Sequence, residues 1–163
     1  MRVIFLDIDG CLNSVSSFIY NNRLRLLGLS DTFSHETLCP IACSNLQYIL
    51  EECTDVQLVI SSTWRKYNTI DELKEKLAAC NVCSDRIIGV TPIDMDRYRG
   101  TEIKEYVDGH PEIKAFVILD DDSDMKPYLD MLVKVDSRNG LTFTDSEKVI
   151  EKLGGPNEKE AQD

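Results

Sequence analysis

The first ten residues place two carboxylates directly behind an apolar segment. Residues 3–6 are all apolar, and they are followed by Asp7, Ile8, Asp9 and Gly10. Side chains two residues apart on an extended segment point the same way, so Asp7 and Asp9 are expected at one edge of a sheet. Gly10 allows the backbone to turn sharply. Because two adjacent carboxylates are costly unless a cation or a reaction uses them, this segment predicts a functional site at the end of a strand.

Short apolar segments alternate with helical patterns along the chain. The expected strands are 2–6, 56–60, 86–90, 115–119 and 131–135. Helical spacing of apolar residues occurs in 42–53 and beyond Gly100, and two capping boxes open further helices. The boxes are Thr69 with Glu72, and Thr144 with Glu147, the second helix running through Leu153. Strands separated by helices predict right-handed crossovers and a parallel sheet covered on both faces.

We therefore expect an α/β domain of the Rossmann-like, three-layer α/β/α kind with a central parallel sheet. At 163 residues the chain has the length of one domain, which is expected to span 1–153. Residues 14–40 interrupt the alternation and are expected to form a small flap or lid, which leaves no room for a large cap. Residues 154–163 begin with Gly-Gly-Pro and are expected to form a flexible tail.

The charge and the hydropathy narrow the expected partners. A formal net charge of −11 disfavours non-specific binding to nucleic acids or anionic membranes, although a local patch or a bound cation could still accommodate a nucleic-acid end. No apolar stretch approaches the length of a membrane span, and the N-terminus lacks the features of a secretory signal. We therefore expect a cytoplasmic domain with no membrane partner, whose oligomeric state the sequence does not indicate.

Six cysteines occur, and without a secretory signal a disulfide framework is not expected. Cys80 and Cys83 have the spacing of half a zinc site or of a redox pair. No second pair of that spacing follows, and the two histidines, His35 and His110, lie far apart in sequence. We therefore interpret Cys80, like Cys53, as a small core residue, with metal binding by Cys80 and Cys83 as the alternative.

Two more polar clusters follow predicted strands. Ser61 and Ser62 come after 56–60, and the segment after 115–119 is rich in acids. Those acids are Asp120, Asp121, Asp122 and Asp124. Because ligands of open parallel sheets bind at the carboxyl ends of the strands, we expect all three clusters to converge on one edge.

This set of residue types suits phosphoryl transfer. Asp7 can attack phosphorus and form an aspartyl-phosphate, while Asp9 can protonate the leaving oxygen and then activate a water molecule. Mg²⁺ would neutralise the clustered acids and the phosphoryl oxygens. Ser61 or Ser62 can donate a hydrogen bond to a phosphoryl oxygen, and Arg99 can balance its charge.

The order Asp7-x-Asp9-Gly10, Ser61, Arg99, Asp120 resembles the four motifs of the haloacid-dehalogenase-like (HAD-like) phosphohydrolases, over about residues 2–150. The resemblance implies that Asp7 is the nucleophile, and that Asp9 is the acid/base whose backbone carbonyl also binds the metal. The catalytic set would be Asp7, Asp9, Ser61 and Arg99, with Ser62 and Lys104 as alternatives to the last two. The metal ligands would be Asp7, Asp9, Asp120 and Asp121, with Asp124 as the alternative to Asp121.

Residues around the site are expected to contact the substrate. These are Gly10, Asn13, Ser62 and Arg65, with Arg23, Arg25 and Trp64 as further candidates. A narrower resemblance rests on four segments, 60–65, 99–103, 118–125 and 140–142. They are similar to the small HAD-type domains of Swiss Army Knife RNA-repair proteins, which implies a phosphatase acting on nucleic-acid ends.

Other interpretations of the acids fit less well. An EF-hand loop needs Gly at its sixth position and Glu at its twelfth, and neither acidic segment supplies them. A phospho-receiver domain would place its acceptor Asp on a middle strand, where this chain has serines. We predict a Mg²⁺-dependent phosphatase acting on a phosphomonoester: a sugar phosphate, a nucleotide, a phosphoprotein or a nucleic-acid end. The alternative is a non-catalytic domain of the same fold that senses phosphate or metal.

Overall fold

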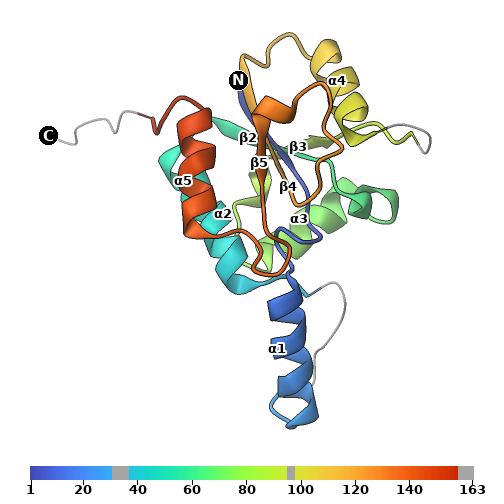
Figure 1. The fold of residues 1–163 in the computed structure, drawn as a ribbon, viewed down its shortest axis with the longest axis vertical. Coiled ribbons are helices and arrows are strands. Elements are labelled where there is room, and N and C mark those ends of the chain that lie inside the picture. Colours follow the sequence, from blue (N-terminus) through green and yellow to red (C-terminus); the bar gives the residue numbers. More distant parts are fainter. Residues whose placement is uncertain (31–36, 95–97, 158–163) are drawn as a thin grey trace, which may run out of the picture.

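A computed structural model describes residues 1–30, 37–94 and 98–157, which contain a five-stranded sheet (Figure 1). The strands are β1 (Arg2–Leu6), β2 (Val56–Ile60), β3 (Ile87–Val90), β4 (Ala115–Asp120) and β5 (Leu132–Lys134). All neighbouring strands run parallel, in the order β3-β2-β1-β4-β5. The predicted parallel sheet is therefore confirmed, and each predicted strand lies within one residue of its observed bounds at either end.

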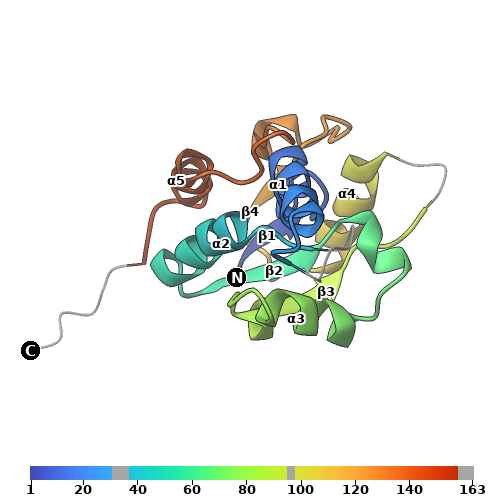
Figure 2. The same cartoon turned by 90° about the horizontal axis from the view of Figure 1, so that it is seen from below.

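Helices cover both faces of the sheet. They are α1 (Val15–Leu26), α2 (Pro40–Glu52), α3 (Ile70–Ala78), α4 (Arg99–Gly109) and α5 (Phe143–Lys152). Apolar residues of α2, α3 and α5 share one core cluster, and Ile103 of α4 belongs to a second cluster on the opposite face (Figure 2). The three-layer α/β/α architecture is therefore confirmed. None of the described helices is both long and apolar enough to cross a membrane.

The continuous apolar run of β1 follows from this burial on two sides. Ile4 and Leu6 pack in the cluster with α2, α3 and α5, whereas Val3 and Phe5 pack in the cluster with α4. All four residues are fully buried. A strand covered on both faces buries side chains in both directions, so its sequence is a nearly continuous apolar run instead of an alternating pattern.

The register of the sheet brings three strand ends to the same level. Leu6 pairs with Ile60 on one side and with Leu119 on the other. The ladder continues one step further, because the N–H of Asp7 donates to Leu119 O at 2.9 Å and that of Ser61 donates to Leu6 O at 3.0 Å. The chain also changes direction across the sheet between β1 and β4, and such switch points are where open α/β sheets bind ligands.

The capping box predicted for α5 is displaced by two residues. The box at Thr69 and Glu72 is confirmed for α3. In α5, however, the N-cap is Thr142. Its hydroxyl accepts a hydrogen bond from the N–H of Asp145, and the Asp145 carboxylate accepts one from the N–H of Thr142. Thr144 is exposed inside the first turn. The pattern was misread because Asp is a shorter partner than the usual Glu of a capping box.

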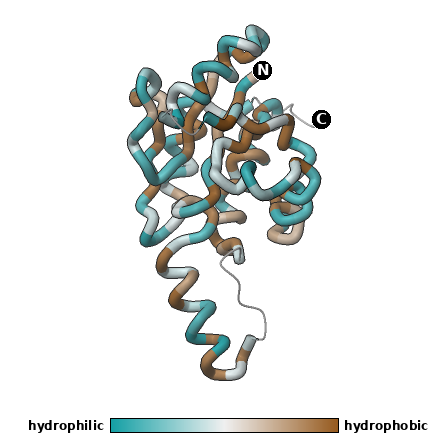
Figure 3. Tube along the Cα trace, turned by 90° about the vertical axis from the view of Figure 1, so that its right-hand side faces the viewer, coloured by the Kyte–Doolittle hydropathy of each residue, from teal (hydrophilic) through white to brown (hydrophobic). Residues whose placement is uncertain are grey.

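Residues 14–40 contain α1, which extends away from the sheet (Figures 1 and 3). A capping box between Ser14 and Ser17 starts the helix, and within the described part of the chain none of its residues is buried. Hydrophobic side chains are exposed along it, among them Ile19 and Tyr20. The remainder of the predicted flap includes 31–36, which lie outside the described residues.

Residues 154–157, which open the predicted tail, are bonded to the rest of the domain. The Arg2 guanidinium donates to Gly155 O at 2.8 Å and to Asn157 Oδ1 at 2.7 Å, and the Asn157 N–H donates to Glu52 O at 2.9 Å. Residues 154–157 are therefore bonded to the N-terminal end of β1 and to the C-terminal end of α2. Residues 158–163 lie outside the described part.

The N-cap of α5 can be tested by substitution. Thr142→Ala removes the hydroxyl that satisfies the N–H of Asp145, so the free energy of unfolding should fall by about 1 kcal/mol. Urea denaturation followed by circular dichroism measures the change. Thr144→Ala is the matched control and should change stability by less than about 0.5 kcal/mol. Equal losses in the two variants would contradict the observed cap.

Candidate active site

Three carboxylates meet where β1 and β4 end. Asp7 follows β1, Asp120 is the last residue of β4 and Asp121 comes next. One oxygen of each lies within 4.8 Å of the others. Asp7 and Asp120 are buried, at 3% and 0% exposure. These are three of the four predicted metal ligands, and their hard oxygen atoms are the donors that Mg²⁺ prefers.

Arg99 supplies the positive charge of this cluster. It is the first residue of α4, and its Nη1 lies 3.0 Å from Asp7 Oδ1 and 2.5 Å from Asp120 Oδ2. The alternative basic residue, Lys104, forms an ion pair with Asp108 on the exposed surface of α4. The structure thus brings Arg99, and not Lys104, to the carboxylates.

One guanidinium does not compensate three acids. Burial, together with repulsion from Asp120, raises the pKa of Asp7 to about 7, although Arg99 acts in the opposite direction. Burial also raises the pKa of Asp120 and that of Asp121. The cluster therefore carries uncompensated negative charge when ionised, and a divalent cation held by Asp7, Asp120 and Asp121 would remove it. The residues present fit such an ion.

Gly10 makes room for this cluster. Its backbone has a φ of +78°, and a Cβ at this position would lie 2.4 Å from Asp121 Oδ2. Any other residue would therefore displace Asp121. The Gly10 N–H donates to Asn13 Oδ1 at 3.0 Å, so it is already used within the loop. A substrate contact through Gly10 stays a prediction, whereas its steric role follows from the geometry.

The carboxylate of Asp9 lies apart from the other three. It is exposed, and its Oδ1 accepts hydrogen bonds from Asn13 Nδ2 at 2.8 Å and from Trp64 Nε1 at 3.0 Å. Its Oδ2 has no hydrogen-bond partner among the described residues. Asn13 and Trp64 thus orient Asp9, a role that the sequence analysis missed. The position of Asn13 three residues after Gly10, on the same loop, is the signal that could have indicated it.

Both serines that follow β2 lie at the site. The Ser62 hydroxyl forms a hydrogen bond with Asp7 and accepts the Trp64 N–H. The Ser61 hydroxyl is fully buried and has no partner within the described part of the chain. An unpartnered buried hydroxyl is costly unless something else bonds to it. Ser61 therefore has a donor to offer, and Ser62 already uses its hydroxyl on Asp7.

Arg65 lines a polar hollow beside Arg99, but the N–H groups of its guanidinium are bonded within the protein. Its side chain is buried and forms an ion pair with Glu102 at 2.5 Å. All five N–H groups of the guanidinium have acceptors: Glu102 and the carbonyls of Ser61, Ser62, Thr91 and Pro92. The substrate contact predicted for Arg65 stays a prediction, and the structure adds a structural role through these bonds. A short-range sequence pattern cannot reveal it, because Glu102 is 37 residues away.

Asp124 accepts hydrogen bonds from the first two N–H groups of α4. Its Oδ2 accepts the N–H of Arg99 at 3.2 Å and its carbonyl accepts the N–H of Gly100 at 3.1 Å. A Cβ on Gly100 would lie 2.3 Å from Lys126 O, so this loop packs directly on the helix terminus. Of the two candidate ligands left open by the sequence, Asp121 belongs to the carboxylate cluster and Asp124 stabilises the helix that carries Arg99.

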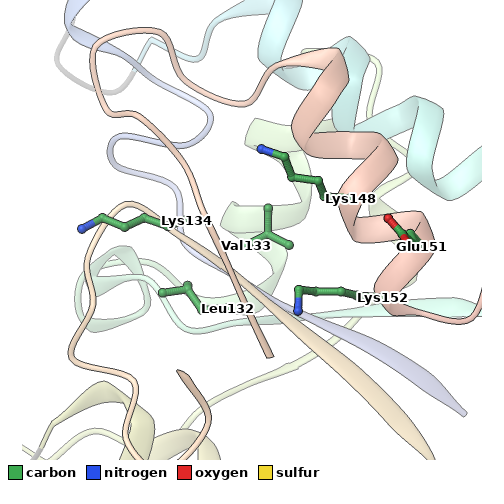
Figure 4. A pocket seen from close by; sticks show the side chains of 6 residues that line it. All are labelled: Leu132, Val133, Lys134, Lys148, Glu151 and Lys152. Carbon is green, nitrogen blue, oxygen red and sulfur yellow. The ribbon is translucent and has the colours of Figure 1, made fainter. Parts of the chain in front are cut away.

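A small polar hollow of about 130 Å³ adjoins Arg99. Its walls include Thr63, Lys66 and Asp94. A second hollow, of about 460 Å³, lies between β5 and α5, where Lys148 and Lys152 extend from the helix toward the strand (Figure 4). No predicted site residue lines the second hollow, so the first is the one that belongs to the candidate active site.

The role of Arg65 can be separated from substrate binding. Arg65→Ala leaves Glu102 buried without its partner, so the free energy of unfolding should fall by about 3–5 kcal/mol. Chemical denaturation measures this. The matched control is Arg23→Ala on α1, where the side chain is exposed and the loss should stay below about 0.5 kcal/mol. Unchanged stability in Arg65→Ala would contradict the structural role.

Comparison with known proteins agrees with the geometry. The family model described as the HAD domain in Swiss Army Knife RNA repair proteins matches residues 3–146. No curated protein and no solved structure shows significant similarity. The match covers β1 from Val3 onward, the other four strands in full and every carboxylate of the candidate site. The chain therefore belongs to the family of HAD domains found in Swiss Army Knife RNA repair proteins.

Proposed function

We propose that this domain is a Mg²⁺-dependent phosphatase that hydrolyses a phosphomonoester through an aspartyl-phosphate on Asp7. Membership of the HAD family supports a hydrolase of that type. The observation that carries the proposal is the separation of two carboxylates on one loop. Asp7 lies buried against Arg99, whereas Asp9 is exposed and held by Asn13 and Trp64. Two carboxylates in such different surroundings suit two different roles.

Asp7 is suited to nucleophilic attack. Arg99 and the Ser62 hydroxyl both favour its ionised form and fix its orientation. In the first step, a carboxylate oxygen of Asp7 forms a bond to phosphorus while the bond from phosphorus to the leaving oxygen breaks. The free hydroxyl of Ser61 and the guanidinium of Arg99 are the candidate donors to the phosphoryl oxygens. Bound Mg²⁺ would supply positive charge to the acids and to the phosphoryl group.

Asp9 is suited to proton transfer. Both of its hydrogen bonds fall on Oδ1, so Oδ2 has no hydrogen-bond partner within the described part of the chain. In the protonated form it gives its proton to the leaving oxygen, and in the second step it accepts a proton from the water that attacks the aspartyl-phosphate. That attack releases inorganic phosphate and restores the carboxylate of Asp7. Asn13 and Trp64 hold Asp9 in position through both steps.

The lack of a large cap among the described residues favours an exposed phosphate as substrate. The hollow beside Arg99 is small and polar, and α1 extends away from the sheet without a buried residue (Figure 1). The name of the matched family refers to RNA repair, so we propose nucleic-acid ends as the first substrate class to test. Arg23 and Arg25 on α1 offer positive charge, whereas the net charge of −11 opposes such a substrate.

Substitution of the two carboxylates tests the mechanism. Asp7→Asn should abolish hydrolysis of an aryl phosphate because the amide is not a nucleophile. Asp9→Asn should lower kcat by about 10²- to 10⁴-fold through loss of acid–base catalysis. Steady-state kinetics with Mg²⁺ measures both, and circular dichroism should show an intact fold for Asp7→Asn. Full activity in Asp7→Asn would overturn the covalent mechanism.

Metal removal tests the cofactor. Treatment with EDTA should abolish activity, and added Mg²⁺ should restore it, because the carboxylates repel each other and the phosphate without a cation. A screen of sugar phosphates, nucleotides, phosphopeptides and 5′- or 3′-phosphorylated oligonucleotides, with Asp7→Asn as the blank, then identifies the substrate class. Mg²⁺-dependent binding of beryllofluoride without turnover of any of these substrates would favour the non-catalytic alternative.

A further inference from the structure

The hollow between β5 and α5 gathers positive charge on an otherwise acidic chain. Its volume is about 460 Å³, and its walls include Lys134 of the strand and Lys148 and Lys152 of the helix (Figure 4). Among the described residues that line it, Glu151 is the one acid, so the lining keeps two positive charges. The smaller hollow beside Arg99 has equal numbers of acids and bases. On a chain with a net charge of −11, this local excess indicates a site for an anion.

Lys134 and Lys152 are held by uncharged acceptors. Lys134 Nζ donates to the Ser123 hydroxyl at 2.8 Å, and Lys152 Nζ donates to the carbonyl of Asp130 at 2.6 Å. Neither acceptor is a carboxylate, so these bonds hold the ammonium groups in place without neutralising them. An ammonium has three N–H donors, which leaves two on each lysine for a ligand.

The lysines follow β5 from one end to the other. Lys134 is the last residue of the strand, whereas Asp130, which binds Lys152, precedes its first residue by two positions. An extended chain rises about 3.3 Å per residue, so these two points lie at most about 13 Å apart. Lys148 and Lys152 are four residues apart and share one face of α5. The charges are therefore spread along the strand, which suits a chain of anionic groups better than a single ion.

One end of the hollow adjoins the carboxylate cluster. Lys134 is paired in register with Asp120, which is the last residue of β4 and a member of the cluster. Ser123, which accepts the hydrogen bond from Lys134, lies on the loop that begins with Asp121. A ligand chain that ends at the carboxylates can therefore continue along β5.

We propose that this hollow binds the phosphate backbone of a polynucleotide whose phosphorylated end lies at the carboxylates. The inference rests on the proposed function and names the substrate class of that site. Lysine binds phosphates as a point charge, and contacts to the backbone position a nucleic acid without reading its sequence. The net charge of −11 opposes this binding only weakly, because salt at 0.1 M screens exposed charges beyond about 10 Å.

Protection of the sheet edge does not explain the whole set of lysines. β5 is the last strand in the sheet order, and lysine on such an edge discourages pairing with another chain. That role suits Lys134, whereas Lys148 and Lys152 belong to the helix. An acidic peptide would match the charge as well. A polynucleotide is favoured because its phosphorylated end is the group that the adjacent carboxylates are proposed to hydrolyse.

Binding can be measured apart from turnover. The full chain with Asp7→Asn, in Mg²⁺, is titrated into short single-stranded oligoribonucleotides that carry a terminal phosphate at either the 5′ or the 3′ end, and fluorescence anisotropy gives Kd. Adding Lys134→Gln and Lys152→Gln should raise Kd at least about tenfold at about 0.1 M salt. The slope of log Kd against log salt should fall by about 1.4, because each phosphate contact on a single strand contributes about 0.7.

The matched control is the pair Lys104→Gln and Lys114→Gln, which removes the same charge from exposed lysines outside the hollow. The control should change Kd by less than about twofold, and circular dichroism should show an intact fold for both pairs. Equal losses of affinity in the two pairs, or no binding of either oligonucleotide, would overturn the subsite. Displacement of the oligonucleotide by polyglutamate at equal charge concentration would also overturn it, in favour of an acidic peptide.

Hydrolysis of an aryl phosphate by the wild-type chain separates this inference from the proposed function, because that substrate has no chain to lie along β5. Turnover of the aryl phosphate without oligonucleotide binding would overturn the subsite and leave the phosphatase in place. Lysine-dependent binding without turnover of any phosphate would support the subsite and overturn the phosphatase.

Discussion

The mutual repulsion of Asp7 and Asp120 is the constraint around which the candidate active site is arranged. These carboxylates end adjacent strands at the same level, and both are buried. Their proximity is tolerable because Arg99 contacts both, and a cation among the three acids would remove the remaining charge. The parallel register that aligns β1 with β4 thus creates the electrostatic difficulty, and the start of α4 relieves part of it.

The helix α4 supports the site in two ways. Its first residue is Arg99, and Asp124 and Gly100 seat this end of the helix against the loop after β4. One turn later, Glu102 forms an ion pair with Arg65. The Arg65 guanidinium in turn donates to the backbone carbonyls of Ser61 and Ser62. Displacing α4 would therefore disturb the guanidinium at the carboxylates and the loop after β2 together. The two buried ion pairs couple the ends of three strands through one helix.

Sequence reasoning was most successful where burial leaves a local signature. β1 and β2 were predicted with their observed bounds because both faces of these strands are covered, so their apolar runs are nearly continuous. The carboxylates and Arg99 were located because they follow strands or begin a helix. The roles of Arg65, Asp124 and Trp64 were missed because each depends on a partner more than 20 residues away. Local patterns do not encode such pairs.

The loop that contains the Asp-x-Asp-Gly segment positions three different parts of the candidate site. Within seven residues it delivers Asp7 to the cluster, leaves space for Asp121 at Gly10 and positions Asp9 through Asn13. Most of these contacts are made within the loop itself or with the adjacent strand end. The geometry of Asp7 and Asp9 is therefore set mainly by the sheet and its first loop.

The exposed helix α1 has a consequence for how this fold can diversify. It contributes no buried residue within the described part of the chain, and it begins directly after the loop that carries Asp7 and Asp9. Its sequence and length are therefore released from the requirements of core packing, and extra residues in such a segment cost little in loop-closure entropy. Related chains can exchange this arm for one of another length or chemistry while the carboxylates stay in place, so new specificities can evolve without refolding the sheet.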